Sequence, residues 1–222
     1  MADTTPVQIP YSFVEYKGIF SEPIFAAFVK RDWAVTRSIY LALQKWGLTL
    51  EQISARQNTT NVSEIQLTFN LPRQGLVVQL SLGSLTIVVT NPDWKRAAEL
   101  VEVTTAIVEA TKAGAETSLQ GQQISLGMHL IPKGKTHKDL TSRFVTVNEQ
   151  TIGFPDKMKG SGFSLYGDKT ALVVDTSGLY PDALFVRIMR THSGNAALAE
   201  MAQVLDKDEK QTFVFLGLHK DA

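Results

Sequence analysis

Residues 64–71 read EIQLTFNL, and polar and apolar side chains alternate at every position of this stretch. A period of two places the apolar side chains on one face of a β-strand and the polar side chains on the other. One buried face and one solvated face are typical of an antiparallel sheet. The stretch therefore predicts an antiparallel strand with half of its side chains in the core.

Three more strands are predicted downstream of this one. The turn at residues 72–75 leads into a strand at 76–82, and Gly83 with Ser84 leads into another at 85–90. Short turns between apolar runs join antiparallel neighbours, so these strands predict a meander. Residues 123–130 alternate in the same way and predict a fourth strand. A further strand is predicted before them, at residues 11–20.

Helical spacing separates these strands. Apolar residues recur every three or four positions between Phe28 and Trp46, which leaves open whether residues 21–46 form one helix or two. Asn91 and Asp93 are good capping residues, and they precede an apolar stripe at helical spacing over residues 94–112. The first half of the chain therefore has the order β-α-β-β-α-β.

The second half is predicted to be rich in strands, at residues 144–147, 163–166, 171–175, 184–189 and 213–218, with one helix at 195–205. The basic loop at 132–139 is the best boundary, which gives an N-terminal half at 1–132 and a C-terminal half at 133–222. Residues 126–129 (LGMH) resemble residues 216–219 (LGLH), so two related ββαβ-type halves or one continuous curved sheet fit the pattern. Either arrangement is an α+β fold: antiparallel sheet with two or three helices packed on one face.

Composition excludes several classes of protein. The 222 residues contain no cysteine, which rules out disulfides and thiolate chemistry. The 22 basic and 22 acidic residues balance, whereas nucleic-acid binding needs a basic excess. No apolar run approaches the ~20 residues that span a bilayer. Residues 1–6 lack the features of a secretory signal. We therefore expect a soluble, cytoplasmic protein that does not bind a membrane, and nucleic-acid binding through the lysines at 133–138 and 157–159 is the least favoured hypothesis.

The histidines are the first candidates for a site. None of the four has the spacing of a metal-ligand set, so no metal site is expected. His129 and His219 each end one of the two similar tetrapeptides, two positions after a glycine that leaves room for a ligand. The competing interpretation is a structural histidine near a strand end.

A second candidate is an arginine in an apolar strand. Arg187 has the parity of Phe185 and Met189, so it is predicted to enter a buried face, where a guanidinium needs a carboxylate or a bound anion. Asp175 is the expected partner in an internal ion pair. By contrast, the acidic residues at 206–209 lie among lysines and are interpreted as a solvated turn.

No nucleophile constellation, metal set or phosphate loop is recognised, so we expect no cofactor and favour a protein that is not an enzyme. The leading hypothesis is a binding or assembly module that acts through protein–protein contacts, including self-association. The alternative is a small-ligand-binding protein or enzyme with a pocket in a concave sheet, lined by His129, His219, Arg187 and Asp175. The two hypotheses differ in whether these four side chains converge.

Overall fold

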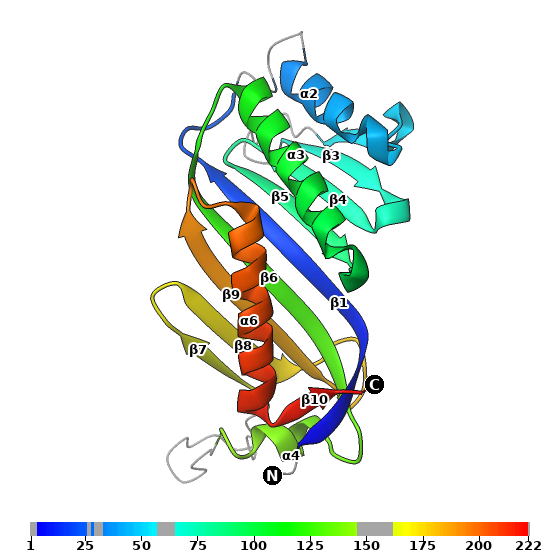
Figure 1. The fold of residues 1–222 in the computed structure, drawn as a ribbon, viewed down its shortest axis with the longest axis vertical. Helices are drawn as coiled ribbons and strands as arrows, with labels where there is room; N and C mark the ends of the chain where they lie inside the picture. Colours follow the sequence, from blue (N-terminus) through cyan, green and yellow to red (C-terminus); the bar gives the residue numbers. More distant parts are fainter. Residues whose placement is uncertain (1–3, 26–27, 29–32, 57–64, 146–161, 222) are drawn as a thin grey trace, which may run out of the picture. The chain divides into compact units, whose positions relative to one another are not determined.

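Ten strands join in one sheet in the computed structural model, which describes residues 4–25, 28, 33–56, 65–145 and 162–221 (Figure 1). The strand order is β2-β3-β4-β5-β1-β6-β9-β8-β7, and β10 pairs with β1. The described strands are β1 Thr5–Phe20, β2 Ile53–Arg56, β3 Gln66–Leu71, β4 Leu76–Ser81, β5 Ser84–Thr90, β6 Leu119–Pro132, β7 Phe163–Tyr166, β8 Thr170–Thr176, β9 Leu184–Ser193 and β10 Leu218–Lys220.

Four α-helices are found in the described part of the chain, namely α2 Ala34–Leu43, α3 Ala97–Ala115, α4 His137–Thr141 and α6 Leu198–Leu216. Short 3-10 turns occupy Gln44–Trp46, Leu50–Gln52, Pro72–Gln74 and Trp94–Arg96. The strand pairs β2–β3, β3–β4, β4–β5, β1–β5, β7–β8 and β8–β9 are antiparallel, while β1 and β10 are parallel. The predicted α+β fold with antiparallel sheet is thus confirmed. No helix among these residues has the length and apolar character needed to cross a membrane.

The chain divides into two compact units, each built from separate segments. Unit 1 contains residues 1–12, 125–190 and 205–222, and unit 2 contains residues 13–124 and 191–204. The boundary expected between residues 132 and 133 falls inside unit 1. The division of the chain into two contiguous halves, and their duplication, stay predictions.

Unit 2 contains the meander that the alternating sequence predicts. Leu67 and Phe69 on β3 lie opposite Leu80 and Val78 on β4, and all four side chains are buried. Helices α2 and α3 pack against each other in this unit. They approach closely because Gly114 has no side chain: a Cβ there would lie 2.8 Å from the Val35 Cα.

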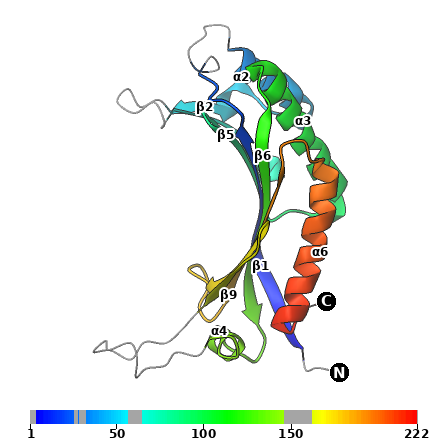
Figure 2. The same ribbon diagram turned by 90° about the vertical axis from the view of Figure 1, so that its left-hand side faces the viewer.

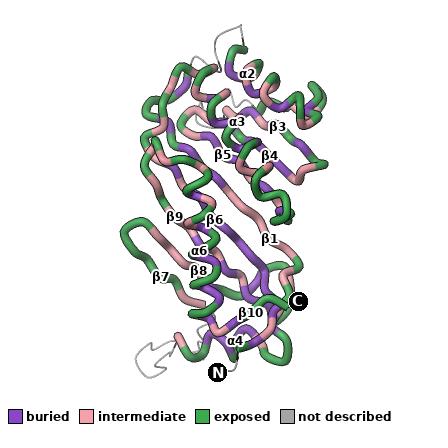
Figure 3. Tube along the Cα trace, viewed as in Figure 1, coloured by how far each residue is buried: buried purple, intermediate pink, exposed green. Residues whose placement is uncertain are grey.

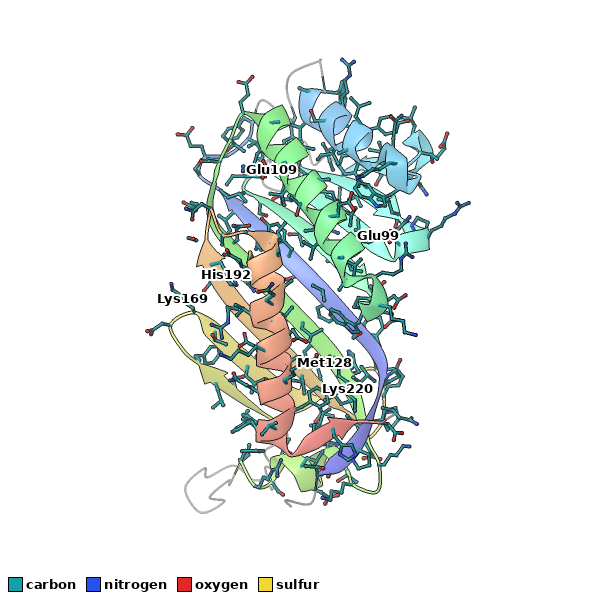
Figure 4. All side chains as sticks on the ribbon, viewed as in Figure 1. Glu99, Glu109, Met128, Lys169, His192 and Lys220 are labelled. Carbon is teal, nitrogen blue, oxygen red and sulfur yellow. The ribbon has the colours of Figure 1, made fainter. Side chains whose placement is uncertain are left out.

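Unit 1 is built around strand β6, which is buried at every position from 124 to 130 (Figure 3). Residues 205–216 of helix α6, which belong to unit 1, run along the sheet of this unit (Figures 1 and 2). Met128, labelled in Figure 4, belongs to a fully buried row with Leu126 and Leu130. On β9, the residues 184, 186 and 188 are buried, and the residues 185, 187 and 189 are only partly covered. The two faces of β9 are therefore unequally covered.

Several predicted elements need correction. The strand expected at residues 213–218 is wrong up to residue 216, because Phe213 and Leu216 belong to the last turns of α6. Gly217 then takes a left-handed φ of 60°, and β10 begins only at Leu218. The two similar tetrapeptides are consequently not equivalent: residues 126–129 lie within one strand, and residues 216–219 span the end of a helix.

Other boundaries also differ from the prediction. Helix α6 extends eleven residues beyond the expected end at 205. Residues 137–141 of the basic loop region form helix α4, which opens with a capping box between Thr136 and Asp139. Phe144 and Val145 are not in a strand, and residues 146–147 of that expected strand lie outside the described residues. In the predicted helical region at 21–46, residues 21–25 are not helical and residues 26, 27 and 29–32 lie outside the described residues. Helix α2 begins after Trp33, whose φ is 52°.

Candidate functional site

His129 on β6 has the most distinctive environment of the predicted site residues. Its imidazole is buried in unit 1 among three aromatic rings. The ring centroids of Tyr11, Tyr180 and Phe185 lie 5.6, 5.9 and 5.0 Å from that of the imidazole. These rings come from β1, from the loop at residues 177–183 and from β9. The side chain is therefore an element of the packed interior of unit 1.

A serine shares this environment. The Nδ1 atom of His129 lies 2.8 Å from the Oγ of Ser177, which is also buried. The same Oγ accepts hydrogen bonds from the backbone N–H groups of Leu179 (3.1 Å) and Tyr180 (3.0 Å). A serine oxygen has two acceptor lone pairs, and these two N–H groups fill them. We therefore assign the hydroxyl hydrogen to the contact with His129, which makes the imidazole the neutral tautomer with its proton on Nε2.

The electrostatics of His129 agree with this assignment. Burial lowers the pKa of His129, because desolvation penalises the charged imidazolium. A Ser–His pair invites comparison with nucleophilic catalysis, in which a base withdraws the proton from an exposed hydroxyl. Here the serine is buried and its oxygen already accepts two hydrogen bonds. The pair therefore has the chemistry of a structural tie between β6 and the loop at 177–183.

Arg187 and Asp175 lie on the strand face that His129 occupies. Asp175 on β8 is opposite Phe185 on β9, and Arg187 is two positions further along β9. The Arg187 guanidinium donates to the Ser125 hydroxyl at 3.2 Å, and Ser125 has the same parity on β6 as His129. On this face Phe185, Arg187 and Met189 are partly covered, while Ser125 and His129 on β6 are buried, so the predicted burial of Arg187 stays a prediction. Asp175 is exposed and accepts a hydrogen bond from the Thr176 backbone N–H.

His219 lies on a different strand, β10. It is exposed and opposite Pro6 at the start of β1. Three of the four predicted residues thus share one face of the strands β6, β9 and β8, and His219 is not on any of these strands. No pocket formed by the four side chains follows from these positions.

The arginine that enters the covered face is Arg190. Its Nε and a terminal nitrogen donate to the two carboxylate oxygens of Asp208 on α6, both at 2.7 Å. This bidentate pair raises the pKa of Arg190. Asp208 was assigned to a solvated turn, yet it is buried within a helix. Its neighbour Glu209 is also buried and lies 3.0 Å from the Lys220 Nζ, labelled in Figure 4.

Comparisons with known proteins add no family. The chain matches no model of a known protein family, and no curated protein is similar to it in sequence. Among the described residues, no three His, Asp or Glu side chains are grouped so as to hold a metal ion.

Proposed function

We propose that this protein is a non-catalytic binding module that acts through protein–protein contacts, and that the outer edge of strand β7 is its contact surface. The observation that carries the proposal is the position of β7 at one end of the strand order, where it pairs with β8 and with no other described strand. The backbone N–H and C=O groups along such an edge are suited to pairing with an added strand.

The composition of β7 supports this role. Natural sheets protect their edges with charged side chains, proline or bulges. The four residues Phe163 to Tyr166 include neither a charged residue nor a proline, and they pair with β8 in unbroken register. Leu165 and Tyr166 are also exposed, by 48% and 77%. The strand at the other end of the order, β2, terminates in Arg56 and carries no large exposed apolar side chain.

Apolar surface continues from β7 onto helix α6. The ring of Phe163 contacts Phe215 at 6.3 Å between centroids, and Phe144 contacts both rings, at 4.9 and 4.8 Å. Phe215 and its neighbour Val214 are exposed by 44% and 79%. Exposed apolar side chains grouped in this way favour a protein partner. The fitting partner is an extended segment that pairs with β7 and places apolar side chains against these residues.

The test uses the absence of cysteine from the chain. Leu165→Cys provides a single attachment point for a photocrosslinker at the β7 edge, and Leu41→Cys on α2 provides a control of similar exposure (54%). Crosslinking in the native cell should give a defined adduct from position 165, either with a second copy or with one partner. Sedimentation velocity of the purified chain distinguishes these two cases.

A charged substitution at the β7 edge provides a second test, because it should prevent the contact that the crosslinker detects. Tyr166→Lys, introduced beside the Leu165→Cys attachment point, should abolish the adduct or the self-association, whereas Leu41→Lys in the same background should leave both unchanged, since only the former places a charge against an added strand. Equal crosslinking from positions 165 and 41, or an adduct from position 165 that persists with Tyr166→Lys, would rule out the β7 edge as the contact surface.

A further inference from the structure

The loop at residues 177–183, which joins β8 to β9, is held by two contacts to other parts of unit 1. Its first residue, Ser177, is tied to His129 on β6. Near its end, the carbonyl of Asp182 accepts a hydrogen bond from the backbone N–H of His137 on α4, at 3.2 Å. The loop also closes on itself, since the Ser177 N–H donates to the Ala183 carbonyl at 2.9 Å. Its conformation therefore depends on the Ser177 side chain at one end.

The hydrogen-bond capacity of Ser177 is fully used. Its hydroxyl donates once, to the unprotonated Nδ1 of His129, and its oxygen accepts twice, from Leu179 and Tyr180. A protonated imidazole is a donor at both nitrogens. The Nδ1–H would then point at an oxygen that has no lone pair left. One of the two backbone hydrogen bonds must break before Ser177 can accept from the imidazolium.

We propose that protonation of His129 opens the loop at 177–183, because the imidazolium disrupts the turn that the Ser177 side chain stabilises. This inference is independent of the proposed contact surface at β7. The exposed Leu179 and the ring of Tyr180 are the side chains that such an opening moves. The protein then changes one surface of unit 1 in response to acid.

The surroundings of His129 favour the neutral form. Burial lowers the pKa of the imidazole. The titratable and charged side chains on its strand face and in the loop are Tyr11 from β1, Tyr180 and Asp182 from the loop, Asp175 from β8 and Arg187 from β9. Protonation therefore requires a pH below the ordinary histidine value of about 6.5.

The experiment measures His129 and the loop separately in the full chain. Nitrogen-15 NMR of the imidazole gives the tautomer and the titration midpoint, and amide hydrogen exchange gives the opening of the Leu179 and Tyr180 N–H groups. After correction for intrinsic exchange, these two amides should exchange about tenfold faster or more once His129 is protonated, the scale of one lost hydrogen bond. Amides in β3 and β4 of unit 2 are the internal reference.

A matched pair of variants identifies the responsible histidine. His129→Asn keeps an acceptor near the Nδ1 position but cannot titrate, so the acid response of the loop should disappear. His137→Gln removes the other histidine next to the loop and should leave the response intact. The proposed role of His129 is refuted if the acid response of amide exchange in the loop survives in His129→Asn or is lost only in His137→Gln. It is also refuted if the wild-type imidazole titrates while the exchange of both amides stays constant, a result that needs no variant to fold.

Discussion

Arg190 on β9 and Asp208 on α6 form two parallel hydrogen bonds of 2.7 Å each, which tie the helix to the covered face of the sheet in unit 1. The carboxylate is buried, and only part of the guanidinium reaches solvent. Replacing one partner of such a pair leaves the other charge buried and unpaired, which is more harmful than removing both.

Arg190→Met should therefore lower the free energy of unfolding by about 3 kcal/mol, and Arg190→Met combined with Asp208→Leu should recover most of that loss. Urea unfolding of the three proteins measures both values. Lys210→Met is the control, because Lys210 and Asp206 form an exposed pair on the same helix, and its effect should stay within about 0.5 kcal/mol. A single variant as stable as the wild type would mean that the pair contributes nothing.

The buried hydroxyl of Tyr16 leads us to expect a loss of stability at alkaline pH. Its hydroxyl donates to the Gln122 Oε1 at 2.8 Å, and the Gln122 Nε2 donates to the carbonyls of Ser193 and Ala196. Burial, with a smaller contribution from the charge of Glu109 (labelled in Figure 4), raises the pKa of Tyr16 well above its ordinary value. The folded protein then keeps a proton that the unfolded chain releases, so stability falls as the pH rises above about 10.

Tyr16→Phe should remove this tyrosine's share of the alkaline loss. The variant also leaves the Gln122 oxygen unpaired, which should lower stability at neutral pH by about 1–2 kcal/mol. Urea unfolding at pH 8 and at pH 10.5 gives both effects, and the difference between the ultraviolet titrations of the wild type and the variant isolates Tyr16 from the other tyrosines. A wild-type and variant difference that is the same at the two pH values would contradict the role of Tyr16.

The absence of a side chain at Gly114 allows α2 and α3 to approach closely, so a larger residue there should destabilise the protein. A Cβ at this position would lie 2.8 Å from the Val35 Cα and 2.9 Å from the Ser38 Oγ. Alanine normally stabilises a helix relative to glycine, but at this position its side chain would push the two helices apart. We expect Gly114→Ala to lower the free energy of unfolding by about 1–3 kcal/mol. Gly121→Ala, where no atom lies within 4 Å of the new Cβ, should change it by less than about 1 kcal/mol.

The meander could be predicted because each of its strands is indicated by residues that are neighbours in the sequence. Residues 66–71 and 76–81 alternate with the period of a half-buried strand, and the structure places β3 and β4 there. The end of α6 could not be predicted in this way. Phe213 and Leu216 are apolar residues that also fit a strand pattern. They are helical because their side chains are buried against the sheet of unit 1, and no neighbouring residue in the sequence indicates that burial.

The site shows the same limit more sharply. Phe185 and Met189 are as apolar as Val186 and Ile188, so the sequence could not indicate that the face of Ile188 is buried while that of Arg187 is only partly covered. Asp208 pairs with Arg190, eighteen residues away, and among lysines it resembled a solvated acid. His129 and Ser177 are forty-eight residues apart and match no spacing rule. In the sequence, His129 is distinguished only by Gly127, two positions before it.

The pairing of β1 with β10 constrains how the protein folds during synthesis. Thr5 and Val7 lie beside Leu218 and Lys220, more than 200 residues later in the chain, so β1 leaves the ribosome long before this neighbour is made. Residues 13–124, which contain the whole meander, need no residue from that end of the chain to form their sheet. Contacts between segments so distant in sequence form slowly because a long loop must close first. Residues 5–12 therefore remain without their β10 partner while residues 13–124 fold, and β10 joins β1 only after the other described strands have been made.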